Sequence, residues 1–293
     1  MRIKKSTPER IFDVFNITFL LLMSSLVVIP VLHVIAGAFS STNALIHSKV
    51  FIWPVDFNLD NFTLVMQNQT FWKAFRVSLF IVFVGTAINM VLTMLTSYPL
   101  SKRYLMGRHY FILMIVFTMI FQAPMIPNYL LINDLGLINS LWALIIPGAL
   151  NAFNLILCVT FFRSLPEELF EAARVDGMSE YKILWKIVLP LSMPIVVTLL
   201  LFYAVQHWNS YFGALIYITN RDLYPLQLYM YNLLTEANAL DNFRGMSVAI
   251  NWDTSPQGLQ MATIVVATAP IVMIYPFIQK HFIKGAMLGS LKE

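Results

Sequence analysis

The chain has 293 residues, of which 58% are hydrophobic and only 12% are charged. So few charged side chains cannot cover a water-soluble domain of this size, and the composition therefore indicates a protein surrounded by lipid. The formal net charge is +4 and no basic patch is interleaved with aromatic residues, which argues against nucleic-acid binding.

Charge-free windows locate the segments that cross the membrane. A spanning helix needs about 20 mostly apolar residues, because its backbone must satisfy its own hydrogen bonds in lipid. Six windows are long enough: 14–48, 77–101, 109–133, 135–162, 187–220 and 254–279. We predict an all-α integral membrane protein with a single transmembrane domain, 1–293, and six spans at about 14–38, 76–100, 109–131, 139–162, 190–216 and 260–280.

The first of these segments resembles a cleavable signal peptide, since basic residues precede an apolar run that ends in Ala36-Gly37-Ala38. The apolar core of a signal peptide is about 7–15 residues long, whereas this run is about twenty residues long. We therefore expect an uncleaved first span.

Prolines predict breaks in the third and fourth spans. Pro124 and Pro127 should end the third helix and start a short outer helix that runs to Gly136. Pro147 and Gly148 should kink the fourth span. Breaks of this kind suit helices that line a changing cavity, and they are also common in ordinary membrane helices.

The distribution of Lys and Arg predicts the orientation, because these residues are retained in cytoplasmic loops. With the N-terminus inside, the cytoplasmic segments hold 14 of the 19 cations. We therefore expect both termini in the cytoplasm and two long outer loops, at about 42–74 and 217–258.

A polar segment interrupts the apolar sequence between the fourth and fifth spans. Ser164 and Glu167 fit a capping box at the start of a helix, and Gly177 fits its C-terminal cap. The predicted helix, at about 165–177, carries an apolar face of Leu165, Leu169, Ala172 and Ala173. A connector that rests on the inner leaflet would explain these features as well as a docking surface does.

The same segment resembles the EAA signature of the membrane subunits of ABC importers. Glu171-Ala172-Ala173 is followed after three residues by Gly177, and further along by Ile187 and Leu189-Pro190 at the spacing of that signature. Residues 126–147, 151–177 and 208–215 and the tail FIKGAMLGSLKE are similar to the carbohydrate-uptake branch (MalG-like). The tail is similar to subunits that serve complex oligosaccharides such as alginate or pectin fragments.

This resemblance implies a type I ABC importer permease fold in a bacterial cytoplasmic (inner) membrane. It also implies a MalF-like second permease, two copies of a MalK-like ATPase subunit, an extracytoplasmic solute-binding protein and surrounding lipid. The permease itself would bind no cofactor, since ATP and magnesium belong to the ATPase. The residues that the resemblance assigns to a coupling helix against the ATPase are Leu169, Phe170, Glu171, Ala172, Ala173, Arg174, Asp176 and Gly177.

Polar residues within the spans are candidates for the translocation path, because polar side chains in spans usually turn away from lipid. Hydrogen bonds between helices explain each of them equally well. In the maltose system the sugar is held mainly by the other permease, and part of 217–260 would reach the binding protein. The candidates are Asn151, Asn154, Gln206, His207, Trp208, Asn209 and Tyr211.

Three other functions remain as alternatives. A secondary transporter would place ionisable residues at membrane depth, but the six windows contain no Asp, Glu, Lys or Arg. An enzyme is disfavoured because the five histidines are scattered, the single cysteine, Cys158, lies within a span, and no G-x-x-x-x-G-K-[ST] motif is present. An ABC permease for a non-sugar solute is compatible with the motif.

Overall fold

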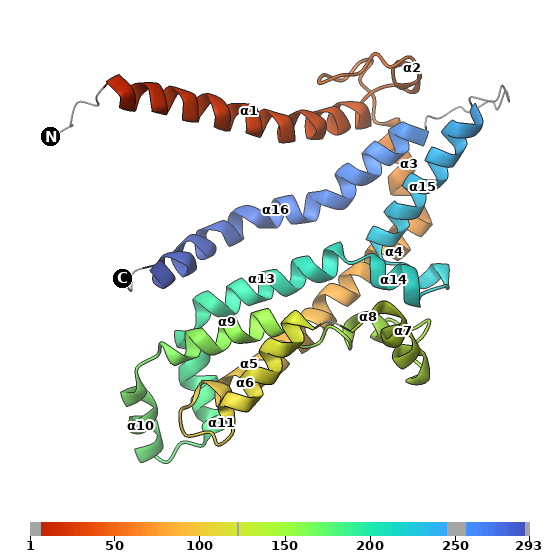
Figure 1. Ribbon diagram of the computed structural model, residues 1–293. Coiled ribbons are helices and arrows are strands. Elements are labelled where there is room, and N and C mark those ends of the chain that lie inside the picture. Colours follow the sequence, from red (N-terminus) through yellow and green to blue (C-terminus); the bar gives the residue numbers. More distant parts are fainter. Residues whose placement is uncertain (1–6, 122, 245–255, 291–293) are drawn as a thin grey trace. The chain divides into compact units, whose positions relative to one another are not determined.

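The computed structural model describes residues 7–121, 123–244 and 256–290, and every regular element in these ranges is a helix (Figure 1). The chain forms two compact units: residues 1–69 with 232–269, and residues 70–231 with 270–293. Two helices, α15 (Leu226–Arg244) and α16 (Pro256–Ser290), contribute to both units.

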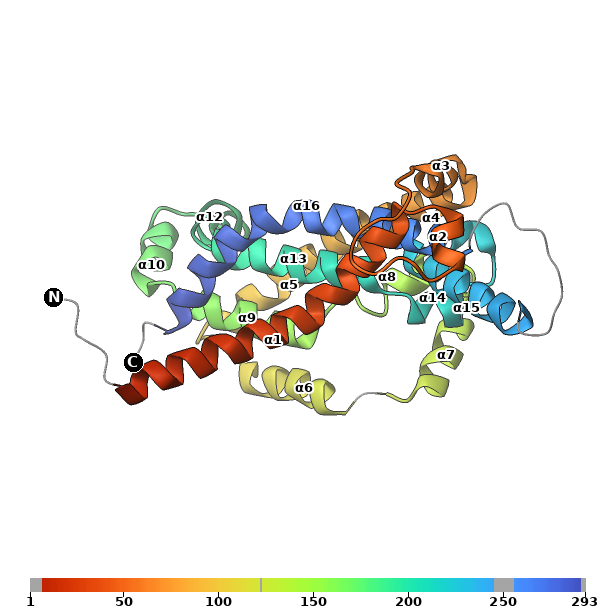
Figure 2. The same ribbon diagram turned by 90° about the horizontal axis from the view of Figure 1, so that it is seen from above.

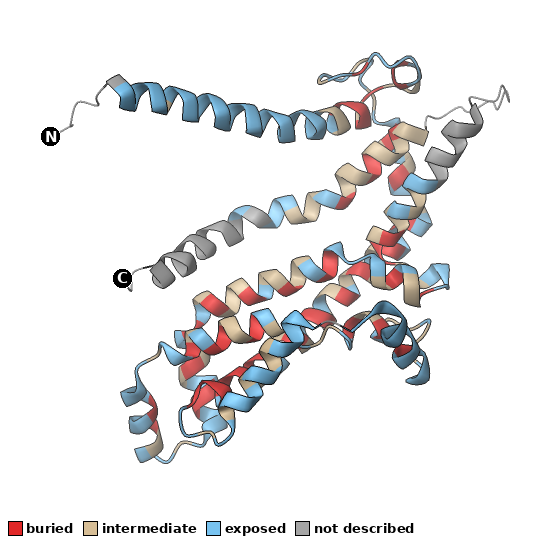
Figure 3. Ribbon diagram, in the orientation of Figure 1, coloured by how far each residue is buried: buried red, intermediate tan, exposed pale blue. Residues whose placement is uncertain are grey.

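The first unit contains α1 (Thr7–Ala38), α2 (Thr42–Ile46) and α3 (Asp60–Gln67). Nearly all of α1 exposes apolar side chains, as expected of a helix whose solvent is lipid (Figure 3). A small core forms where α1 ends, and it consists of Ala36, Ala44, Leu45 and Val50 with Met261 of α16 packed against it. More than half of the predicted outer loop 42–74 is helical, because it contains α2, α3 and the start of the next helix, α4 (Gln69–Phe80).

The second unit is organised around one long helix. Its parts are α4 (Gln69–Phe80), the π-helical η1 (Ile81–Gly85) and α5 (Thr86–Ser101). Helices α9 (Ala152–Arg163) and α13 (Met193–Asn209) pack beside α5, and the three run alongside one another in both ribbon views (Figures 1 and 2). A buried hydrogen bond of 2.7 Å between the Thr93 and Tyr203 hydroxyls joins α5 to α13.

The third predicted span is broken near its prolines. Helix α6 (Arg108–Ile120) ends before Phe121, and Pro124 directly precedes α7 (Met125–Asp134). Gly136 follows α7 with a φ of +68°, a conformation that glycine adopts without strain. The predicted break and the short second helix are both present.

The fourth predicted span, 139–162, is not one helix. A short α8 (Trp142–Ile145) stops before Pro147, and α9 begins only at Ala152, with the Asn151 side chain capping its first turn. We predicted a kink, but the helix is interrupted completely. Residues 146–151, which include Pro147, are not helical, because proline lacks the backbone N–H that a helix needs.

The fifth predicted span, 190–216, is also divided. The elements α11 (Glu180–Ile183), η2 (Leu184–Val188) and α12 (Leu189–Leu191) form a bent pair with α13, at an angle of 87°. Beyond α13 lie α14 (Phe212–Tyr217) and the 3₁₀ turn η3 (Arg221–Leu223).

The predicted outer loop 217–258 contains a 19-residue helix, α15, so describing it as a loop was wrong in part. Residues 245–255 of that loop lie outside the described residues. Three described helices are long and apolar enough to span a membrane: Pro8–Ala38, Gln69–Ser101 and Pro256–Ile274. The number rises to five if the bent pairs α6–α7 and α11–α13 each count as one span. Helix α9 is also apolar but has only 12 residues.

Candidate functional site

The polar segment forms helix α10 (Glu167–Val175), at the end of α9 (Figure 1). The predicted capping box is wrong. Ser164 instead ends α9, where its hydroxyl donates to the Phe161 carbonyl at 2.7 Å. Pro166 stands at the N-cap of α10 without a side-chain cap, and Glu167 and Glu168 occupy the first turn, where the helix dipole favours acidic residues.

The C-terminus of α10 is closed by the predicted glycine. Gly177 has a φ of +73°, in the left-handed region. The Gly177 amide donates to the Arg174 carbonyl and the Met178 amide donates to the Ala173 carbonyl, both at 3.0 Å. This pair of bonds is a Schellman motif, and it fixes the direction in which the chain leaves α10.

Helix α10 has a buried side and an exposed apolar side. Phe170 and Ala173 are 2% and 3% exposed, respectively, and they belong to the core formed by α5, α9, α11 and α13. Leu169, Ala172 and Val175, three residues apart, point away from that core. The predicted apolar face is therefore divided, because Leu165 and Ala173 pack inside the chain while Leu169 and Ala172 remain exposed.

Phe170 is held by a cation from the neighbouring loop. The Lys102 ammonium lies 2.9 Å from the centre of the Phe170 ring and 5.0 Å from that of Tyr98, and the Lys102 residue is only 3% exposed. A cation over an aromatic face is attracted by the ring, more strongly when water is excluded. Burial lowers the pKa of Lys102 to about 8. This contact joins α10 to the end of α5.

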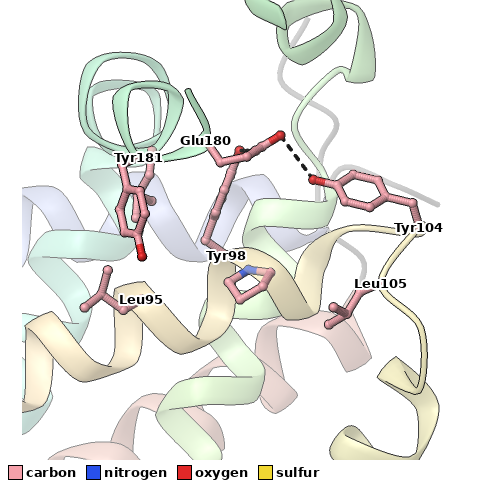
Figure 4. A pocket seen from close by; sticks show the side chains of 8 residues that line it. Leu95, Tyr98, Tyr104, Leu105, Glu180 and Tyr181 are labelled. Carbon is pink, nitrogen blue, oxygen red and sulfur yellow. Dashed lines mark hydrogen bonds between the residues drawn. The ribbon is translucent and has the colours of Figure 1, made fainter. Parts of the chain in front are cut away.

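A second contact joins the other end of α10 to α5 and α11. Arg174 Nε donates to Glu180 Oε1 at 2.9 Å, and Arg174 Nη2 donates to the Tyr104 hydroxyl at 3.0 Å. Tyr98 donates to Glu180 Oε2 at 2.5 Å and Tyr104 donates to Glu180 Oε1 at 3.3 Å. Figure 4 shows the Glu180 carboxylate between the two tyrosines. The hydrogen bond to Glu180 raises the pKa of Arg174. Arg174 therefore stays charged and keeps its ion pair with Glu180.

These tyrosines and Glu180 also border a cavity of about 310 Å³, which is lined by the end of α5, the loop after it, α11 and the start of η2 (Figure 4). Sequence reasoning missed Tyr98, Lys102, Tyr104 and Glu180. The only available signal was that Lys102 and Tyr104 lie in the short basic loop between two spans, which did not reveal that this loop packs on α10. The remaining lining residues are Leu95, Pro99, Leu105, Tyr181 and Leu184.

The predicted coupling residues fall into three environments. Phe170 and Ala173 are inward, and Arg174 and Gly177 shape the end of the helix. The remaining members of the set are exposed: Leu169, Glu171, Ala172 and Asp176.

His207, one of the predicted path residues, lies inside the bundle. It is 8% exposed, and its Nε2–H donates to Asn89 Oδ1 at 2.6 Å, while Asn89 Nδ2 donates to the Gly148 carbonyl at 2.6 Å. Because the amide oxygen can only accept, the histidine carries its proton on Nε2. The ring rests on the backbone of Gly85 in the π-helical turn, where a β-carbon would collide with it. His207 therefore joins α13 to α5 through a buried hydrogen bond.

The other path candidates differ in their burial and in their hydrogen-bond partners. Asn151 Oδ1 accepts from the backbone N–H of Asn154 at 3.0 Å, and Asn154 is buried. Trp208 is 6% exposed and its indole N–H has no partner in the described part of the chain. Tyr211 stacks on Tyr231 with ring centres 5.4 Å apart. Gln206 and Asn209 are exposed, and among the seven residues a hydrogen bond joins Asn151 to Asn154.

The chain matches the family described as "Binding-protein-dependent transport system inner membrane component" over residues 62–287, and it belongs to that family. The predicted family resemblance and the all-helical permease fold are thereby confirmed.

Two relatives from Bacillus subtilis (strain 168) are similar over almost their whole length. Protein LplC is 43% identical over 289 residues, covering 97% of this chain and 95% of the relative. The polygalacturonan/rhamnogalacturonan transport system permease protein YtcP is 41% identical over 285 residues, covering 97% and 99%.

A solved structure has the same fold. It is a chain of a bacterial ABC transporter involved in the import of the acidic polysaccharide alginate, 32% identical, with a TM-score of 0.88 over 96% of this chain and 99% of that one. A second chain, from a bacterial alginate ABC transporter, is 14% identical with a TM-score of 0.59 and supports the fold alone.

Proposed function

We propose that this chain is the permease subunit of an ABC importer that carries oligosaccharides across the cytoplasmic membrane, with both of its own termini in the cytoplasm. Family membership supports the transport role and a requirement for a solute-binding protein. The excess of Lys and Arg in segments on the side of the N-terminus, 14 of 19, supports the orientation.

The observation that carries the proposal is the construction of α10. A helix of nine residues has its inner side fixed by Phe170 and Arg174 and presents Leu169, Ala172 and Val175 outward, with Val175 89% exposed. Exposed apolar side chains are unfavourable in water. A docked protein would cover this strip. The resemblance of this segment to the EAA signature supports an ATPase subunit as that protein.

The mechanism that follows is alternating access. ATP-driven closure of two partner ATPase subunits would draw the coupling helices of the two permeases together. In this chain the displacement of α10 would pass to α5 through Lys102 and to α11 through Glu180, because those are the side chains that hold it. The chain would bind no nucleotide, and ATP and magnesium would remain in the partners.

The substrate class that we favour is an oligosaccharide rich in uronic acids. The YtcP relative is named for polygalacturonan and rhamnogalacturonan, and the 32% identical structure belongs to a transporter for alginate. These polymers share carboxylated sugar rings. Less similar relatives, at 27% identity, are named for arabino-oligosaccharides and for lactose, so a neutral oligosaccharide is the second candidate.

Uptake by the reconstituted complex tests the proposal. The chain would be co-purified with its partner permease and ATPase, placed in liposomes, and supplied with binding protein and labelled oligogalacturonate outside and ATP inside. We expect uptake that requires ATP and the binding protein and that is stronger than uptake of a neutral oligosaccharide. Uptake driven by an ion gradient without ATP would contradict the proposal.

A further inference from the structure

A strongly cationic cavity lies beside the coupling helix and is distinct from the pocket of Figure 4. It has a volume of about 630 Å³ and lies where α5 ends, α6 begins and α9 leads into α10. Its lining includes four cations and one carboxylate: Lys102, Arg103, Arg108, Arg163 and Glu167. An excess of three positive charges around one cavity indicates a site for an anion.

Two of the three guanidinium groups of this cavity are positioned by backbone oxygens. Arg163 Nη2 donates to the Leu100 carbonyl at 3.3 Å, and Arg108 Nη1 donates to the Lys102 carbonyl at 3.4 Å. In the part of the chain that the structure describes, neither forms an ion pair with a carboxylate. Each guanidinium has five N–H donors in a planar fork, so both keep donors that suit the oxygens of a phosphate.

Helix α6 begins at Arg108, which lines the cavity, and it exposes apolar side chains along its length. None of the side chains of α6 is fully buried. Met106, in the loop just before α6, is 91% exposed, and Tyr110, in its first turn, is 75% exposed. Further along, Leu113 and Met114 are 58% and 60% exposed. An anion bound here would thus have a strip of apolar surface beside it, as a molecule with a charged head and acyl chains requires.

We propose that this cavity binds the phosphodiester headgroup of an anionic membrane lipid, with the acyl chains lying along α6. The inference uses the cytoplasmic placement of this end of the chain proposed above, where basic pockets between spanning helices bind acidic headgroups. A phosphate between Arg108 and Arg163 would reduce the repulsion between two positive charges that form no ion pair with an acidic residue among the described residues. It would also lie close to Lys102, which holds Phe170 of α10, so the lipid would support the attachment of the coupling helix.

Native mass spectrometry of the purified, delipidated complex tests this proposal. Phosphatidylglycerol and phosphatidylcholine would be added separately to the wild type, to the double variant Arg108→Gln/Arg163→Gln and to the control Arg221→Gln, which removes a cation far from the cavity in sequence. We expect the wild type and the control to retain phosphatidylglycerol in preference to phosphatidylcholine. The double variant should bind phosphatidylglycerol about tenfold more weakly.

A milder variant keeps the test decisive if the double variant does not fold. Arg163 is exposed, so Arg163→Gln alone should leave the fold intact and weaken phosphatidylglycerol binding about threefold. Equal retention of phosphatidylglycerol by wild type and Arg163→Gln, or equal binding of the two lipids, would overturn the proposal. So would displacement of the lipid by millimolar inorganic phosphate, which would identify a free-anion site. The measurement needs neither sugar nor ATP, so its failure is separate from a failure of the proposed function.

Discussion

Replacing Gly177 by alanine would test whether the geometry of the coupling helix matters for transport. Gly177 has a φ of +73°, and a β-carbon built there would meet no atom within 4 Å, so the substitution changes backbone strain and not packing. A left-handed conformation costs a residue other than glycine about 1–2 kcal/mol. Since about 1.4 kcal/mol corresponds to a factor of ten, opening of the Schellman motif should become roughly tenfold more frequent.

Gly136→Ala is the matched control, because Gly136 has a φ of +68°, equally open surroundings and a position after α7. Hydrogen exchange in Gly177→Ala should be about tenfold faster at the backbone amides of position 177 and Met178. ATP-driven uptake should fall several-fold in that variant and stay near the wild-type rate in Gly136→Ala. Gly177→Asn should recover much of the loss, since asparagine tolerates this conformation better. Equal uptake in Gly177→Ala and wild type, despite faster exchange, would refute the reasoning.

Three further predictions concern charge and burial. Glu171→Lys should leave the subunit inserted and associated with its partner permease but abolish uptake, because Glu171 is exposed on α10; wild-type uptake would contradict its role. The pKa of Lys102 is lowered by burial to about 8 from 10.5, so between these pH values the unfolded chain holds a proton that the folded chain has released. The free energy of unfolding should therefore rise with pH across this window, by at most about 3 kcal/mol, and thermal melting should show no such rise in Lys102→Met. Asn89→Leu would leave the His207 donor unpaired, and it should cost about 1–3 kcal/mol in detergent melting, whereas Asn209→Leu should have little effect.

Much of the fold follows from hydropathy. The charge-free windows coincide with apolar helices because lipid forces the backbone to bond within each segment. What the windows could not reveal is where a helix stops inside an apolar run. Residues 146–151 leave the helix although no charge marks them, and α15 is helical although Asn, Gln and Tyr made it look like a loop.

The coupling segment could be predicted in position but not in its contacts. Gly177 was identifiable because a helix end needs a residue that accepts positive φ. Ser164 misled because a serine between two helices can bond to either, and here it bonds back to Phe161. The contact of Lys102 with Phe170 joins residues far apart in sequence, and periodicity within one helix carries no information about it.

The polar residues of the spans show a similar limit. Their sequence positions predict that they turn away from lipid but do not distinguish a hydrogen bond between helices from a contact with a sugar. His207 proves to be bonded to Asn89, a residue that the sequence did not single out. The roles of Asn151, Gln206 and Trp208 in a translocation path stay predictions.

The central claim is that the exposed side of α10 meets an ATPase subunit in the cytoplasm, and site-specific cross-linking tests it most directly. Ala172→Cys places a thiol on the exposed side, whereas Ala173→Cys places one on the buried side, where the wild-type residue is only 3% exposed. The native Cys158 is fully buried, so it can stay in place. In inside-out vesicles that contain the whole complex, Ala172→Cys should cross-link to the ATPase and Ala173→Cys should not. Labelling of Ala172→Cys by an impermeant thiol reagent only from the outside, with no cross-link to the ATPase, would contradict the account.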